Sequence, residues 1–153
     1  VMRDAQMLER IAVRWHINLP VNEIFMLQSR IEWVASQHAL NPEQGVLAFV
    51  GGRIRLKEKW QLKLRYTIFD TKSYASAIWA FEDDVPYSFS VPAFYQNGSK
   101  WYVLLVWKAK NNLEFWFRVA DLSYQNATTI GSGNDLILGS NRTEVKALVR
   151  VSF

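Results

Sequence analysis

The chain has 153 residues, half of them hydrophobic and 14% aromatic, and its formal net charge is +4. This length fits one domain or a piece of a larger one, and the composition excludes an intrinsically disordered chain. The absence of cysteine excludes disulfides, thiolate metal sites and thiol catalysis. No run approaches the ~20 apolar residues of a membrane-spanning helix. The mild positive charge does not select a partner by itself.

The first half of the chain alternates between apolar and polar residues with a period of two. Residues 5–19 place Val13 and Trp15 on one side and Arg14 on the other. Because strand side chains point alternately to opposite faces, this pattern predicts a β-strand. Further strands are predicted at residues 25–36, 46–57 and 60–68. Turn-forming residues separate the first two strands, a longer loop is expected at 38–44, and a tight turn is expected near residue 58.

The second half continues the pattern with more aromatic residues. Residues 73–82 and 86–95 are predicted as two weaker strands around the acidic run Glu82-Asp83-Asp84. Asn97-Gly98 is a hairpin-turn signal. Strands are then predicted at 101–109, 113–119 and 145–153, and the polar stretch 125–142 is predicted to be an extracellular loop. The count is about nine strands, and no segment has a convincing helical period.

This alternation fits two architectures. In a soluble barrel or sandwich the apolar face would point inward, whereas in an outer-membrane barrel it would face lipid. Several alternating runs last 11 to 15 residues, which favours tilted membrane-crossing strands over soluble strands of ~5–6 residues. Trp60, Trp101 and Phe115 near strand ends and the mix of short and long connections point the same way. We therefore expect an antiparallel up-and-down transmembrane β-barrel over residues 1–153.

The strand count and the chain ends predict that this barrel is incomplete. Val1 is not an initiator methionine and no secretory signal follows it, so a targeting segment is expected upstream. If the short turns face the periplasm and the chain ends there, an odd number of strands leaves one edge unpaired. We therefore expect the chain to be the C-terminal part of a larger barrel, completed by upstream residues or another chain.

Two regions carry a resemblance to a known family. Residues 69–95, and Thr129-Ile130-Gly131-Ser132-Gly133 with the later Gly139 and Arg142, resemble outer-membrane proteins of Bacteroidota that are described as helix-hairpin-helix domain-containing. The terminal strand also resembles the signal read by the barrel-assembly machinery, carried here by Val149, Val151 and Phe153. The resemblance implies a structural, transport or secretion-related barrel in the outer membrane of a Gram-negative bacterium. The helix-hairpin-helix module is absent from this chain, so no nucleic-acid binding is implied.

The sequence offers little catalytic or metal chemistry. His16 and His38 lie far apart, and no ligand spacing resembles a metal site, so no metal, cofactor or catalytic residue is expected. The run Glu82-Asp83-Asp84 could hold calcium through carboxylate oxygens, but a solvated turn is the favoured interpretation. Gly131-Ser132-Gly133 is interpreted as a flexible loop, because no Walker-type lysine follows it.

The basic residues of the polar faces form the one group with a clear physical meaning. They are predicted to share the lumen with fewer acids, chiefly Glu32, Glu114 and Glu144. Two readings remain open: a salt-bridged interior that plugs a narrow lumen, and an anion-favouring pore lined by cations. The predicted lumen-facing residues are Arg10, Arg14, Arg30, Arg53, Arg55, Lys63, Arg65, Arg118, Lys146 and Arg150.

These observations favour a membrane component over an enzyme. The expected function is a structural, transport or secretion-related outer-membrane barrel. Its expected partners are membrane lipid, the barrel-assembly machinery, and other outer-membrane or periplasmic subunits. The alternative is a soluble β-barrel or sandwich module that binds an apolar ligand. An enzyme ranks last, because no nucleophile, base and acid form a convincing set.

Overall fold

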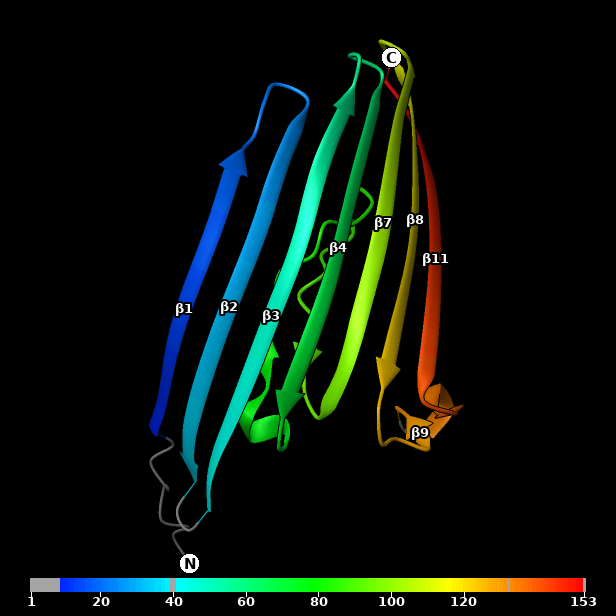
Figure 1. Ribbon diagram of the computed structural model, residues 1–153. Coiled ribbons are helices and arrows are strands. Elements are labelled where there is room, and N and C mark those ends of the chain that lie inside the picture. Colours follow the sequence, from blue (N-terminus) through cyan, green and yellow to red (C-terminus); the bar gives the residue numbers. More distant parts are fainter. Residues whose placement is uncertain (1–8, 39–40, 132, 153) are drawn as a thin grey trace, which may run out of the picture.

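Seven long strands form one antiparallel up-and-down sheet in the computed structural model, which describes residues 9–38, 41–131 and 133–152 (Figure 1). The strand order is β1-β2-β3-β4-β7-β8-β11, so every neighbour in the sheet is also the next long strand along the chain. This confirms the predicted all-β, antiparallel up-and-down fold. The strands are β1 (Glu9–Pro20), β2 (Phe25–His38), β3 (Asn41–Leu56), β4 (Trp60–Thr71), β7 (Asn97–Lys110), β8 (Leu113–Tyr124) and β11 (Asn141–Val151).

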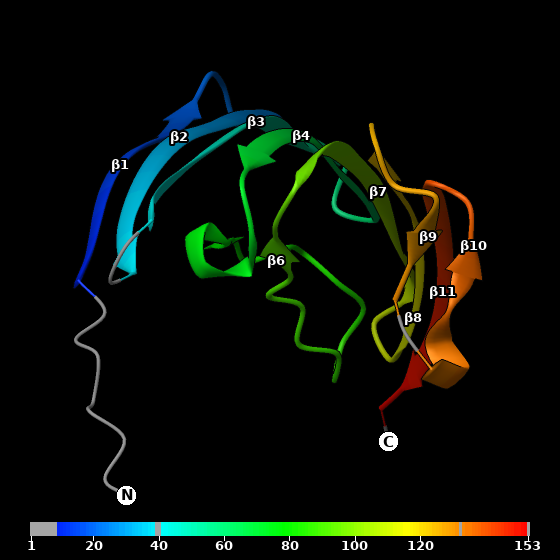
Figure 2. The ribbon, with the colours of Figure 1, turned by 90° about the horizontal axis from the view of Figure 1, so that it is seen from below.

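The sheet curves into an open arc and does not close into a barrel (Figure 2). Within the described residues, β1 pairs only with β2, and β11 pairs only with β8. These residues alone therefore do not form a closed barrel, and the expectation that they are part of a larger one stays a prediction. The inner side of the arc is called the concave face, and its outer side is called the convex face.

Residues 72–96, called the inner segment here, fold into the hollow of the arc (Figure 2). They contain η1 (Tyr74–Ser76), β5 (Ile78–Trp79) and β6 (Ala93–Phe94), and β5 and β6 pair only with each other. The prediction of two further strands of the sheet at 73–82 and 86–95 is therefore wrong. Pro86 and Pro92 cannot donate backbone hydrogen bonds to a central ladder, which explains why this stretch leaves the sheet.

Two predicted connections also differ from the structure. The loop expected at 38–44 is mostly strand, because β2 extends to His38 and β3 begins at Asn41, where the two residues pair. Asn97-Gly98 is not a hairpin turn but the start of β7, and it pairs with Asp70 and Phe69 of β4. A side chain at Gly98 would place Cβ 2.3 Å from the Ser123 carbonyl oxygen, so glycine serves close strand packing there rather than a turn.

The connections divide between two ends of the sheet (Figure 1). Tight turns join β1 to β2, β3 to β4 and β7 to β8 at the end that we call the short-turn end. The inner segment leaves and rejoins the sheet at the opposite end, the long-connection end, and the connection after β8 also lies there. That second connection contains β9 (Thr129–Ile130), η2 (Gly133–Asp135) and β10 (Ile137–Leu138). No helix among the described residues is long and apolar enough to cross a membrane.

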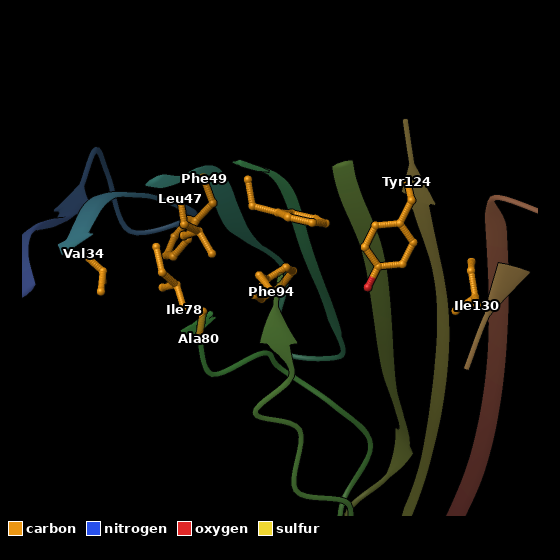
Figure 3. Close-up of a cluster of buried hydrophobic side chains, with 9 residues drawn as sticks. Val34, Leu47, Phe49, Ile78, Ala80, Phe94, Tyr124 and Ile130 are labelled. Carbon is orange, nitrogen blue, oxygen red and sulfur yellow. The ribbon is translucent and has the colours of Figure 1, made fainter. Parts of the chain in front are cut away.

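The apolar core lies between the concave face and the inner segment rather than between two sheets (Figure 3). Val34, Leu47 and Phe49 of the sheet pack with Ile78 and other buried residues of the inner segment. A smaller cluster joins Val85 of the inner segment to Leu104 and Val106 of β7. Burying these side chains fixes the inner segment against the sheet, because each large apolar side chain contributes ~1.5–3 kcal/mol on burial.

Candidate functional site

The ten basic residues singled out by the sequence all lie on the concave face. The strand register settles this, because residues that pair directly across neighbouring strands share a face. Arg14 pairs with Glu32, Arg53 with Lys63, and Lys146 with Arg118. Arg30, Arg65 and Arg118 are buried there, with Arg118 only 1% exposed.

The convex face is apolar and open. On the outer strand β1, Ile11 is 64% exposed and Trp15 is 65% exposed, and on the central strand β4, Tyr66 is 49% exposed whereas its neighbour Arg65, on the concave face, is 7% exposed. The large hydrophobic residues exposed on this face are Ile11, Val13, Trp15, Ile17, Leu19, Ile31, Val46, Val50, Leu56, Trp60, Leu64, Tyr66, Ile68, Trp101, Val103, Trp107, Phe117, Val145, Val149 and Val151. The open convex face of the sheet is thus almost wholly apolar, whereas the buried charged side chains lie on the concave face beside the core.

A polar row ends the apolar face toward the long-connection end. Asp70 pairs with Asn97, and Ser99 pairs with Ser123, which in turn pairs with Asn141. These residues share the convex face with the apolar side chains, because their spacing from them along each strand is even. The convex face is therefore an apolar band with a defined polar border.

Four arginines hold the backbone of the inner segment. Side-chain nitrogens donate to the carbonyl oxygens of four alternate residues in the segment. In an extended chain alternate carbonyls point to the same side, so one edge of the segment faces the cations. The hydrogen bonds are Arg10 to Ala77 (2.7 Å), Arg30 to Trp79 (3.2 Å), Arg65 to Phe81 (2.5 Å) and Arg118 to Asp83 (3.1 Å).

These four donors come from β1, β2, β4 and β8, so the inner segment crosses most of the sheet's width. A hydrogen bond from a charged donor contributes ~1.5–3 kcal/mol, about twice a neutral one. The row therefore anchors the segment along its length rather than at one point.

The acidic run of the inner segment is buried against the same cations. The Glu82 carboxylate accepts from Lys100 at 2.7 Å and from Arg118 at 2.8 Å. Lys63 binds Asp83 at 2.5 Å, and Lys146 binds Asp84 at 2.7 Å. The interpretation of Glu82-Asp83-Asp84 as a solvated turn is therefore wrong, since the side chains of Glu82 and Asp84 are each 1% exposed.

The pKa of Asp84 reports this environment. Burial alone would raise the pKa of the carboxyl. The hydrogen bonds from Lys146 and from the Val85 N–H, together with the charges of Arg118 and Lys146, outweigh burial and hold the pKa of Asp84 below its ordinary value. The carboxylate is thus ionised and takes part in ion pairs at neutral pH.

Aromatic rings complete the contacts of the two central arginines. The Arg65 guanidinium lies 3.9 Å from the centre of the Phe49 ring and 5.5 Å from that of Tyr102. Arg118 lies 5.0 Å from the same Tyr102 ring. A guanidinium within ~6 Å of a ring centre gains cation–π energy, most of all when it is desolvated. These rings therefore help the concave face to hold buried cations.

The remaining predicted cations do not bind the acidic run of the inner segment. Glu32 binds Arg14 at 2.6 Å and also Arg30, and Glu114 binds Arg150 at 2.5 Å. Arg53 and Arg55 lie on the same face but form no ion pair with any described residue. The predicted acids Glu32, Glu114 and Glu144 thus each neutralise part of the cationic face, and Glu144 does so by binding Arg118 at 2.7 Å.

Sequence reasoning did not connect the acidic run to the cations, and it did not single out Lys100 or Tyr102 as members of the site. Lys100 lies one position before the apolar residue Trp101, so extending the alternation of β7 backwards would have placed it on the concave face. The clue to the acidic run was the charge balance: ten cations on one face opposed three acids, and Glu82-Asp83-Asp84 is the only run of three acids in the chain.

The other residues singled out by the sequence stand apart from this cluster. His16 lies on the concave face with its ring 6.0 Å from that of Phe49, and the side chain of His38 lies outside the described residues. Val149 and Val151 lie on the convex side of β11, and Phe153 also lies outside the described residues. No group of three metal-ligating side chains occurs among the described residues.

Comparison with known proteins finds no match to a family model, to a curated protein or to a solved structure.

Proposed function

We propose that this chain is a structural or transport component of the bacterial outer membrane, forming part of a β-barrel whose interior is filled by the inner segment. The observation that carries the proposal is the inverted sheet: apolar side chains are exposed on the convex face, and buried arginines lie on the concave face. The proposed partners are membrane lipid and the barrel-assembly machinery. The resemblance to helix-hairpin-helix domain-containing outer-membrane proteins of Bacteroidota is part of this proposal.

The dimensions of the apolar band support a lipid environment. On β1 it runs from Ile11 to Leu19, about 26 Å along the strand at ~3.3 Å per residue. At the usual barrel tilt of ~35–45° this corresponds to about 20 Å across the membrane, close to the ~25 Å apolar band of outer-membrane barrels. A soluble monomer rarely exposes a continuous apolar patch larger than a few hundred Å².

An aromatic row near the short-turn end gives further support. The rings of Trp60 and Trp107 stack at 5.2 Å between centres, and those of Trp107 and Phe115 stack at 5.0 Å. They come from three neighbouring strands, β4, β7 and β8, and lie beside two tight turns. Tryptophan favours the interface between hydrocarbon and headgroups, so this row fits one girdle of a membrane barrel.

The ion-pair network favours the plug over the open pore. The inner segment is bound by four backbone contacts and by the three acids of its run, so the cations of the concave face are largely neutralised. The function that we propose is therefore a barrel that is closed at rest.

One observation keeps anion passage as a second candidate function. A cavity of about 340 Å³ near the short-turn end is lined by the basic residues Arg55, Lys57, Lys59, Lys108 and Arg150. It also contains Glu58 and Glu114, so the cations exceed the acids. Rings of Arg and Lys favour anions in pores. If the inner segment moved aside, anions could pass through this cavity.

Depth-dependent fluorescence quenching tests the membrane proposal. We would compare a variant that retains only Trp15, on the convex face, with one that retains only Trp116, on the concave side. Both would be placed in bilayers whose acyl chains carry bromine. Strong quenching of Trp15 and weak quenching of Trp116 is expected, because only the first side chain should contact acyl chains.

The quenching experiment has a bromine-free control and one result that would contradict the proposal. Bilayers without bromine should leave both emissions unchanged. If the chain is monodisperse without detergent and neither tryptophan is quenched, the membrane proposal fails and the soluble module replaces it.

A further inference from the structure

The two outer strands of the sheet present unpaired backbone edges. β1 has 12 residues and β11 has 11, and within the described residues each is hydrogen-bonded on one side only. About half of the N–H and C=O groups of an edge strand point away from the sheet. In hydrocarbon each unsatisfied group costs several kcal/mol, so both edges need partners if the chain lies in a membrane.

The strand directions exclude the simplest closure. The sheet has seven antiparallel strands, an odd number, so β1 and β11 run in the same direction. They cannot pair antiparallel with each other. Two copies related by rotation about the barrel axis would bring β1 of one copy beside β11 of the other, again in parallel. An inverted second copy would place an inner segment at both membrane surfaces.

The contents of the arc set a minimum size for the missing part. An eight-stranded barrel has an interior just wide enough for its own side chains. Here the concave side also holds residues 72–96. One added strand would therefore leave no room for the inner segment, and the next odd number is three.

The charge of the outer strands indicates the chemistry of the partner. On the concave side β1 carries Arg10 and Arg14 and no acid, and β11 carries Arg142, Lys146 and Arg150 with one acid, Glu144. Three of these side chains stay half-exposed: Arg14 at 53%, Arg142 at 51% and Arg150 at 40%. Opposite charges directly across a strand pair are stabilising, whereas like charges are not.

We propose that β1 and β11 bind a partner β-segment with an odd number of antiparallel strands, at least three, whose outer strands alternate apolar and acidic residues. This inference rests on the proposed membrane function, because water would satisfy the edges of a soluble sheet. It extends that function by stating the orientation, minimum size and charge of the missing part.

Hydrogen–deuterium exchange on the 153-residue chain in detergent micelles tests the proposal. The probes are two synthetic 11-residue peptides, one alternating valine with glutamate and one alternating valine with lysine. Without peptide, amides of β1 and β11 should exchange at least ~10-fold faster than those of central β4. The glutamate peptide should slow exchange in both edge strands ~10-fold or more at a concentration at which the lysine peptide has no effect.

A charge-reversed variant supplies the matched control. R10E/R14E should lose the response to the glutamate peptide at β1 and keep it at β11, and unchanged protection of β4 would show that the sheet is intact. If this variant does not fold, the comparison of the two peptides on the unaltered chain still tests whether the edges prefer an acidic strand. Protection of β1 and β11 without any peptide, or equal effects of both peptides, would overturn the inference. The quenching of Trp15 would be unaffected by that failure, so the membrane proposal is judged separately.

Discussion

At the scale of single residues, Arg118 connects more groups than any other cation described above. Its guanidinium contacts Glu82, Glu144, the carbonyl of Asp83 and the ring of Tyr102. Removing one partner of a buried ion pair leaves the others uncompensated, which is costlier than removing an exposed pair. The burial of Arg118, rather than its charge alone, thus gives it a structural role.

R118Q should therefore lower the free energy of unfolding by ~3–5 kcal/mol. The matched control is R142Q, because Arg142 also faces Glu144 but is half-exposed, and an exposed pair is worth ~0–1 kcal/mol. Denaturant unfolding in detergent, followed by tryptophan fluorescence, would measure both values. Equal effects of the two variants would mean that the buried network does not stabilise the fold.

Asp84 gives a prediction for pH. Its pKa in the folded state lies below the ordinary value, so its carboxylate stabilises the fold above that ordinary value and loses this effect as pH falls through the folded pKa. D84N should cost ~1–3 kcal/mol at neutral pH, and this cost should shrink as pH falls through the folded pKa, because the native residue then becomes protonated as well. Unfolding curves of both proteins over a series of falling pH values test this. A cost that does not depend on pH would show that the charge of Asp84 is not what matters.

At the scale of elements, the sequence predicted the long strands well and the inner segment poorly. Alternation such as Val13-Arg14-Trp15 is a local signal, and it also predicted which side chains share a face. The path of residues 72–96 depends on contacts with strands far away in sequence, such as Arg10 with Ala77, and no local period encodes them. The acidic run was interpreted by its local turn chemistry, although its partners lie on β4, β7, β8 and β11.

Gly45 of β3 is an element-scale contact that mutation can test. A Cβ at this position would lie 2.7 Å from the Ser76 carbonyl oxygen, so glycine lets the start of the inner segment approach the sheet. G45A should destabilise the protein by ~1–3 kcal/mol, as overpacking does. G52A is the control, because the nearest atom there is the far end of the Phe25 ring, which can move. Measuring the free energy of unfolding of both variants tests this. A G45A variant as stable as the native protein would show that the inner segment does not pack tightly against β3.

At the scale of the whole molecule, the inner segment decides whether the proposed barrel is open or closed. Replacing its acids in E82Q/D83N/D84N removes the inner segment's ion pairs with Lys63, Lys100, Arg118 and Lys146 while leaving the backbone intact. In planar bilayers, we expect the conductance of this variant to rise from near zero and to favour anions.

The control for this experiment neutralises three exposed acids, in E9Q/E23Q/D135N, and should leave conductance unchanged. A rise in both variants would attribute the effect to net charge rather than to release of the inner segment. No conductance in either would favour a purely structural barrel.

The two ends of the inner segment meet at one point of the sheet rim. Asp70 and Asn97 are direct partners across β4 and β7, and the Thr71 N–H donates to the Gln96 carbonyl at 2.7 Å. The chain thus leaves and re-enters the sheet at neighbouring residues, so a replacement segment could be joined at these two positions. Such a replacement would have to supply acceptors for the buried Arg65 and Arg118 and apolar side chains for the core, because the concave face is built around both.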